Sequence, residues 1–461
     1  MRPLITRILG VVGATAVVAL PGCTQDLLEV NDPDIILEET LEASSASGAI
    51  GLHNGAIFRL EQATAGTQQP DALFVFGGLL ADEWQSGDTF IQRNTMDQRI
   101  WDPKNTFHAG PYRNLNRVRV LAEGAIVGLR TYKPTPATNI GRMFAFIAYV
   151  EALMGEHYCN GTPISTLQGS TIVPGDPISN DSMLALAIAN TDSALANLGG
   201  ADSADVRYLA QVVRGRALLD RAQFAPAAAA VAGVPDAFRY DVEYSVASID
   251  NQIWALNSSA RRYTLANSEG GNGLNYRTAV DPRVPAAVGV GSGNRIFDTA
   301  FPLQVVRQGI WGRESAVKIA SGIEARLIEA EAALRAADAT TWLAKLNQLR
   351  ADPTLLPVPV DTTYKPPAGT TLAPLTDPGP STNDSLRVDL MFRERAFWMF
   401  GTGHRLGDMR RLLRQYNRNA EQVYPTGAWF KGGNFGDAIQ MPVPVEEQNN
   451  PRFAQCTDRL P

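Results

Sequence analysis

The segment between residues 393 and 411 holds the side chains that could carry out acid–base chemistry. Glu394 and Asp408 supply carboxylates, His404 supplies an imidazole, and arginines flank all three. A histidine beside a carboxylate can act as a general base. However, the apolar residues of this segment recur at helical spacing on both sides of a glycine-rich turn, which predicts two adjacent helices. We therefore interpret the charged residues as a partly buried ion-pair network that joins the two helices. Its predicted members are Glu394, Arg395, Arg405, Asp408 and Arg411.

Other catalytic patterns are missing from the sequence. It contains no Gly-Xaa-Ser-Xaa-Gly nucleophile elbow, no Walker phosphate loop and no His-Glu-Xaa-Xaa-His or paired-cysteine metal motif. Asp82 and Glu83, like Glu446 and Glu447, are adjacent carboxylates, and adjacency does not place two acids across a substrate. No acidic loop has calcium-site spacing. The sequence therefore predicts no enzyme, no metal site and no cofactor.

Cys23 is the residue that we expect to be modified. Residues 1–22 begin with two arginines and continue with an apolar run too short to span a bilayer, and Cys23 follows as in a bacterial lipobox. We expect export, cleavage before Cys23 and acylation of its thiol by palmitate-type chains, because several acyl chains give stable attachment to a membrane. Pro21 departs from the usual lipobox, and an ordinary signal peptide with an incidental cysteine is the alternative.

The remaining two cysteines predict a disulfide. Cys159 and Cys456 are the only cysteines after Cys23, and in an exported chain their pairing is the simplest expectation. The bond would tie the C-terminus to the loop after a helix that ends near Tyr158. A zinc pair is the weaker alternative, because the chain has only four histidines.

Composition and charge describe a globular body that does not bind nucleic acid. Apolar residues make up 45% of the 461 residues, which predicts a large core. The formal net charge is −6, and removal of residues 1–22 with their two arginines makes it −8. This acidic balance argues against nucleic acid and against a polybasic membrane patch.

Helical periodicity dominates from about residue 44, which predicts a mainly α fold. Helix pairs with short connections, with small residues where helices cross, resemble tetratricopeptide hairpins. Unrelated amphipathic helices are the alternative. The predicted helical scaffold covers about residues 105–235 and 318–415, whereas residues 236–315, 351–384 and 417–445 are irregular and rich in Gly and Pro. The aromatic content of residues 236–315 favours ordered functional loops over disordered linkers.

Five motifs, in the same order along the chain, resemble the SusD/RagB family of outer-membrane lipoproteins. They are NDP at 31–33, YRNLN at 112–116, EARLIEAE at 324–331 with LNQLR at 346–350, FRER at 392–395 with GHRLGDMRR at 403–411, and PVP at 442–444 followed by Glu446 and residues 450–451. No single motif is decisive, but together they span essentially the whole chain after Cys23.

The resemblance implies a lipidated linker at 23–43 and one SusD-like body at 44–461, in which tetratricopeptide-like hairpins pack with an irregular, loop-rich half. It also implies a lipoprotein on the outer membrane that faces the cell exterior and captures a glycan or a peptide. The partner would be a TonB-dependent, SusC-like β-barrel that imports the cargo. A helical-repeat scaffold lipoprotein that binds a protein partner is the alternative.

If the ligand is a glycan, flat aromatic side chains should stack on its sugar rings, and polar neighbours should bind the hydroxyl groups. The loop-rich ligand region at 236–315 and 351–384, together with the segment after Asp82, contains the candidates. The predicted ligand-contacting residues are Trp84, Trp254, Tyr263, Tyr276 and Trp311, with Asn257, Asn275 and Arg277 as polar partners.

Overall fold

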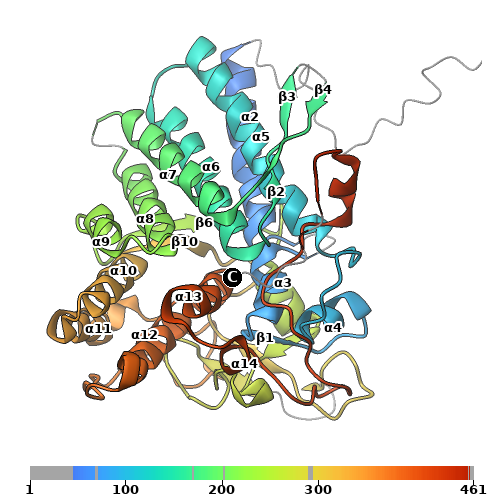
Figure 1. Ribbon diagram of the computed structural model, residues 1–461, viewed down its shortest axis with the longest axis vertical. Coiled ribbons are helices and arrows are strands. Elements are labelled where there is room, and N and C mark those ends of the chain that lie inside the picture. The colour runs from blue at the N-terminus through green and yellow to red at the C-terminus, as the bar shows by residue number, and fades with distance from the viewer. Residues whose placement is uncertain are drawn as a thin grey trace, which may run out of the picture. The chain divides into compact units, whose positions relative to one another are not determined.

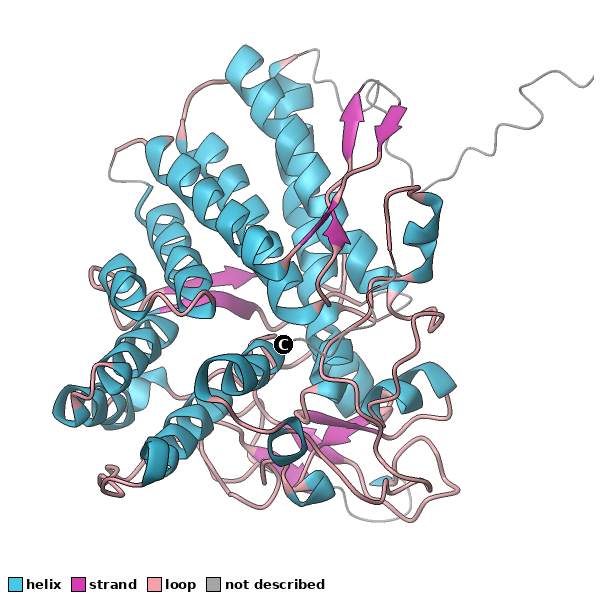
Figure 2. Cartoon of the chain, viewed as in Figure 1, coloured by secondary structure: helices cyan, strands magenta, loops and turns pink. Residues whose placement is uncertain are grey.

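The computed structural model describes residues 45–67, 71–168, 171–200, 203–288, 294–454 and 456 (Figure 1). Cys23, the predicted signal peptide and the predicted linker at 23–43 lie outside these residues. Most of the described chain is helical, and its strands are short (Figure 2), so the prediction of a mainly α fold is confirmed. The α-helices are α2 (Ala46–Thr64), α3 (Leu73–Leu80), α4 (Ile91–Asp97), α5 (Ala109–Tyr132), α6 (Thr138–His157), α7 (Asn180–Ala196), α8 (Ala204–Asp220), α9 (Phe224–Val231), α10 (Gly322–Arg335), α11 (Ala339–Ala351), α12 (Ser385–Trp398), α13 (Arg405–Tyr416) and α14 (Ala420–Val423).

Side-chain caps explain where some of these helices begin. The Ser321 hydroxyl accepts a hydrogen bond from the Glu324 N–H at 3.3 Å before α10. The Asp338 carboxylate accepts one from the Thr341 N–H at 2.9 Å before α11. Each cap satisfies an N–H group that the first helical turn leaves without a partner.

Helices that follow one another in sequence pack side by side. The contacts run from α5 to α6, α7, α8 and α9, and from there to α10 and α11, while α2 lies along α5. Gly215 of α8 permits one close crossing, because a Cβ atom there would meet Val231 of α9 at 2.5 Å. The predicted hairpins therefore join into one continuous stack of helices (Figure 1). α2 extends this stack before the range 105–235 that the sequence predicts for it.

Short strands connect the loop segments. β1 (Trp84–Ser86) pairs with β7 (Tyr263–Leu265), β6 (Arg239–Val242) with β10 (Val317–Ser321), β8 (Ala286–Val288) with β9 (Val306–Gln308), β2 (Thr162–Pro163) with β5 (Pro177–Ile178), and β3 (Thr166–Gln168) with β4 (Thr171–Val173), all antiparallel. Shorter helical turns are η3 (Trp254–Ser259), η4 (Glu269–Gly271), η6 (Pro353–Leu355), η7 (Thr382–Asp384) and η8 (Val445–Asn449). We call the part built from β1, β7, β8, β9 and their connecting loops the loop-rich half.

The disulfide predicted between Cys159 and Cys456 is present. The two Cα atoms lie 6.1 Å apart, and the bond joins residues 297 positions apart in sequence. Cys159 follows the C-terminal end of α6, and its N–H also donates to the Met441 carbonyl at 3.0 Å. The C-terminal segment is thus attached to the central helix by a covalent bond and by backbone pairing.

Candidate ligand-binding cleft

The loop-rich half contains a cleft of about 580 Å³. This volume lies within the range of roughly 300–1,000 Å³ that is typical of small-molecule sites. Its walls come from three segments: the loop at 277–284, strands β8 and β9 with Asn294, and residues 363–365. The lining residues are the apolar Val280, Val284, Ala286, Ala287 and Val306 and the polar Arg277, Asn294, Arg307, Thr363 and Lys365.

Backbone pairing holds two of these segments together. In the β8–β9 pair, Ala287 lies opposite Arg307, and residues opposite each other share one face of a sheet. On the other edge of β8, Ala286 exchanges two backbone hydrogen bonds with Lys365, both 2.9 Å long. Arg307 and Lys365 therefore line the cleft from segments that pair with the two edges of β8.

A buried carboxylate anchors the third wall to the helices. Glu394 of α12 accepts hydrogen bonds from Arg283 at 2.7 Å and from Arg350 of α11 at 2.9 Å. Arg283 also donates to Asp281 within the same loop. Burial by itself would lower the pKa of Arg283, but the hydrogen bond that it donates to Asp281 and the charge of Glu394 raise it. The loop that carries Val280 and Val284 is thus fixed to α11 and α12 by ion pairs.

Most of the aromatic residues predicted to contact ligand are not at the surface. The exposed fractions of Trp84, Tyr263, Tyr276 and Trp311 are 0%, 1%, 0% and 5%. Trp84, Tyr276 and Trp311 pack around Phe400, with ring centroids 5.0, 4.8 and 6.5 Å from it. The expectation that these four rings lie exposed on loops is wrong. Loops without a helical apolar face build their core from large aromatic side chains instead.

The other predicted residues have separate surroundings. Trp254 is half-buried beneath the guanidinium of Arg313, and Asn275 accepts a hydrogen bond from Arg393 at 3.1 Å. Asn257 is buried and donates to two backbone carbonyl groups, so its role is structural. Of the predicted ligand-contacting residues, Arg277 alone is among the described residues that line the cleft.

Arg307 and Lys365 are cleft residues that the sequence did not single out. Lys365 lies within the predicted ligand region at 351–384, but neither residue belongs to a motif. The aromatic rings that are exposed in the fold are also different from those predicted. Phe90 and Phe297 are 43% and 38% exposed and lie on the Arg262 guanidinium, 4.9 and 3.8 Å from its central carbon. Only the exposure of each ring in the fold could have revealed this set.

Solved structures match the fold of the whole body. A SusD-like carbohydrate-binding protein from Bacteroides fragilis aligns with a TM-score of 0.63 at 12% identity, over 89% of this chain and 99% of that chain. A SusD superfamily protein from the same species has a TM-score of 0.61 at 13% identity, with the same shares covered. One from Bacteroides vulgatus has a TM-score of 0.59 at 13% identity, over 90% of this chain and 99% of that chain. The chain has a SusD-like fold.

No family model and no curated protein sequence matches the chain. At 11–14% identity the likeness to solved structures concerns the fold, and at this level the resemblance to the SusD/RagB family is confirmed. In this SusD-like fold the motif at 403–411 spans the turn before α13 and its first two turns, and all of its residues are buried. The motif is therefore part of the helical core.

The predicted ion-pair network separates into two sets in the SusD-like fold. Asp408 accepts hydrogen bonds from Arg395 at 2.9 Å and from Arg411 at 2.6 Å. Burial would raise the pKa of Asp408, but the positive charges of Arg395 and Arg411 lower it to about 2. Glu394 belongs to the other set, which holds the cleft loop. Arg405 is buried but forms no ion pair with any residue that the structure describes.

His404 is also a buried residue of the SusD-like core. Its Nδ1 lies 2.9 Å from the Thr402 hydroxyl, and its Nε2 lies 3.3 Å from the Glu324 carboxylate. Burial and the nearby charge of Arg216 lower the pKa of His404. With an exposed fraction of 2%, the imidazole has no open path to a substrate.

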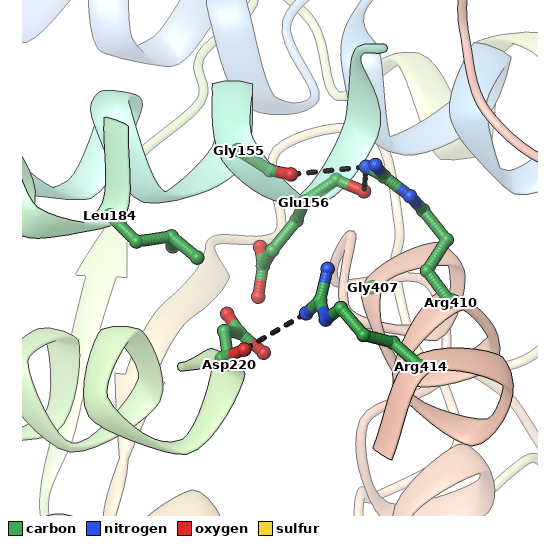
Figure 3. A pocket seen from close by; sticks show the side chains of 7 residues that line it. All are labelled: Gly155, Glu156, Leu184, Asp220, Gly407, Arg410 and Arg414. Atoms are coloured by element: carbon green, nitrogen blue, oxygen red, sulfur yellow. Dashed lines mark hydrogen bonds between the residues drawn. The ribbon is translucent and has the colours of Figure 1, made fainter. Parts of the chain in front are cut away.

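A second hollow lies where α6, α8 and α13 meet, but it has no space for a molecule the size of water. Figure 3 shows Arg410 donating to the carbonyl groups of Gly155 and Glu156, and Arg414 donating to that of Asp220. Burial raises the pKa of both the Glu156 and the Asp220 carboxyl groups. This hollow is therefore a polar junction between helices.

Among the described residues, no helix is both long and apolar enough to cross a bilayer. Within the same residues, no three His, Cys, Asp or Glu side chains are grouped as a metal site requires. The cleft is accordingly the site on which the proposed function rests.

Proposed function

We propose that this protein binds a carbohydrate in the cleft formed by the loop at 277–284, strands β8 and β9 and residues 363–365. The observation that carries the proposal is the chemistry of the lining, which combines an apolar surface with several hydrogen-bond donors. The SusD-like fold supports it, because some solved structures with this fold are described as SusD-like carbohydrate-binding proteins.

The lining can contact both faces that a sugar presents. Sugar rings carry apolar C–H groups, which can pack against the exposed Val280 and the half-buried Ala286 and Ala287. Their hydroxyl oxygens can accept hydrogen bonds from Arg277 and Arg307, whose side chains are partly exposed. A mostly apolar pocket with a few well-placed polar groups is the usual form of a small-molecule site.

We further propose that Cys23 carries lipid and holds the protein on the outer face of the outer membrane. There it would deliver its saccharide to a TonB-dependent, SusC-like barrel. The lipobox-like sequence before Cys23 supports the anchor, and the SusD-like fold supports the transport role. Incorporation of labelled palmitate in cells, present in the wild type and lost in Cys23→Ser, tests the anchor. Co-purification of a β-barrel with the wild-type protein from outer membranes tests the delivery step.

Calorimetric titration of the full chain in detergent tests carbohydrate binding. The panel should contain neutral oligosaccharides, acidic oligosaccharides and short peptides. A ligand at about 100 times its Kd should stabilise the fold by about 2.7 kcal/mol, which a thermal-shift assay detects independently. We expect saturable binding of at least one oligosaccharide. Binding of peptides alone would contradict the proposal.

A variant that fills the cleft links this binding to the site. Ala287→Trp places a large ring beside Arg307 and should abolish binding. The matched control is Ala229→Trp on α9, where the side chain is exposed, and it should bind like the wild type. Equal melting temperatures of the two variants would show that both fold. Undiminished binding by Ala287→Trp would exclude the cleft.

A further inference from the structure

The charge of the cleft has one sign. Three lining residues carry a positive charge, namely Arg277, Arg307 and Lys365, whereas no Asp or Glu is among the described residues that line it. None of the three forms an ion pair with a described residue. This sets them apart from the arginines just outside the cleft, because Arg283 and Arg350 both bind Glu394.

The acidic residues that flank the cleft in sequence have other partners. Asp281 binds Arg283 at 2.7 Å. Asp361 accepts hydrogen bonds from the N–H and the hydroxyl group of Thr363. These carboxylates thus already have hydrogen-bond partners, whereas the three cleft cations form no ion pair within the described part of the chain. The Nε–H group of Arg307 in addition has no acceptor among the described residues, so the protein does not use its full hydrogen-bonding capacity.

The backbone spaces two of these cations at the scale of a saccharide. Arg307 lies on β9 and Lys365 pairs with the opposite edge of β8, so their backbones are separated by two strand spacings. At about 4.8 Å per spacing this is roughly 10 Å between the two backbones. Arg277 adds a third cation from the opposite loop.

We infer that the cleft selects an anionic saccharide, one that carries carboxylate or sulfate groups; this rests on the proposed function. Like charges brought together repel one another, and a bound anion removes that repulsion. Arginine also binds a carboxylate through two parallel hydrogen bonds, which fixes the orientation of the ligand as well as its charge. The chain as a whole has a net charge of −6, so the positive cleft is a local feature and not a consequence of overall composition.

A pair of ligands that differ only in charge tests the inference. An oligogalacturonide and its methyl ester share one sugar backbone, but only the first is anionic, and a sulfated galactan oligosaccharide supplies the other anion. We expect calorimetry on the full chain to give the acid at least about tenfold tighter binding than the ester, equivalent to about 1.4 kcal/mol. Raising the salt concentration from about 0.05 M to about 0.5 M should weaken binding of the acid only.

Charge-removing variants locate the effect in the cleft. Arg277→Gln and Lys365→Gln should each weaken binding of the anionic oligosaccharide about tenfold. Binding of the ester should weaken much less in each variant, because glutamine removes the charge but keeps a hydrogen-bond donor. The matched control is Arg239→Gln on β6, where the side chain is exposed outside the cleft, and it should change neither. Lys365 is exposed, so its variant keeps the test valid even if a variant at the more buried Arg307 does not fold.

The outcomes separate this inference from the proposed function. If the acid and the ester bind equally, and Ala287→Trp abolishes both, the cleft binds carbohydrate but does not select anions, and the inference is overturned. If no oligosaccharide binds, the proposed function fails and the inference fails with it. Preference for the sulfated ligand over the galacturonide would support the inference and identify sulfate as the anion.

Discussion

Glu83 gives this fold a pH dependence that can be isolated by one substitution. Its side chain is 1% exposed and accepts a hydrogen bond from the Gly401 N–H at 2.8 Å. Burial raises the pKa of the Glu83 carboxyl to about 8, although the Gly401 N–H and the charge of Arg405 oppose the rise. Near neutral pH the folded protein therefore favours the protonated, uncharged acid. Glu83→Gln replaces it with a group of the same shape that cannot ionise and can still accept from Gly401.

The size of the effect follows from the pKa difference between the two states. The unfolded Glu83 has a pKa of 4.5, and the folded one has a pKa of about 8, so the folded state holds the proton more tightly. Stability from this group is fully present below pH 4.5 and is lost as the pH rises through 8. At about 1.36 kcal/mol per pH unit, the loss between about pH 5 and about pH 9 is about 4 kcal/mol.

Urea unfolding followed by tryptophan fluorescence measures this loss. Between about pH 5 and about pH 9, the free energy of unfolding of Glu83→Gln should rise by about 4 kcal/mol relative to that of the wild type. Glu446→Gln, which changes an exposed carboxylate, is the control and should track the wild type. A difference between Glu83→Gln and the wild type that stays constant with pH would refute the reasoning, because it would mean that Glu83 titrates alike in both states.

Two further predictions concern the bonds that hold the cleft and the C-terminus. Glu394→Ala leaves Arg283 and Arg350 without their shared carboxylate, and in a urea titration it should lower the free energy of unfolding by about 3–5 kcal/mol. The control Asp389→Asn removes an exposed carboxylate of α12, and in the same titration it should lower the free energy of unfolding by less than about 1 kcal/mol. Replacing Cys159 and Cys456 together by serine opens a loop of 297 residues and should lower the free energy of unfolding by about 5 kcal/mol. The measurement is the urea midpoint of unfolding, which should fall in the double variant and fall equally when the wild type is reduced.

The helices could be predicted because their signals are local. Met143, Ile147, Val150 and Met154 recur at helical spacing, and all four are buried in α6. The same pattern does not reveal that the opposite face of α6, where Ala145 and Ala152 lie, is buried as well. That burial depends on α5, α7 and α8, which pack around α6. Periodicity identifies one apolar face, whereas the number of neighbours is a property of the tertiary fold.

The ion pairs also show that tertiary partners cannot be predicted from a local sequence pattern. Glu394 and Arg395 are adjacent in sequence, which invites their assignment to one network. On a helix, however, adjacent residues point about 100° apart and do not face the same neighbours. Arg395 accordingly meets Asp408 on α13, while Glu394 meets Arg283 from a loop more than a hundred residues away. The residue types predicted ion pairing, but only the fold determined which partners they have.

The cleft was the least predictable part, because loops have no period that separates buried from exposed positions. Trp84 and Trp311 lie in segments that the sequence predicts to be functional loops, yet in the fold their buried rings form the core of those loops. The predicted region at 351–384 does contain Lys365, and Arg277 was among the predicted residues. Arg307 lies within the predicted region at 236–315 but was not singled out, since its place beside Ala287 follows from the β8–β9 register.

The cleft differs from the core of this protein in how its positive side chains are compensated. A charge in the interior is costly unless a partner compensates it, and the buried Arg395 and Arg411 each bind carboxylates. Arg277 and Lys365 can remain without such partners because water reaches their side chains. A ligand that displaces this water must then provide the compensating charge itself. A neutral sugar cannot do so, and for this reason the unpaired cations favour an acidic ligand over a neutral one of the same shape.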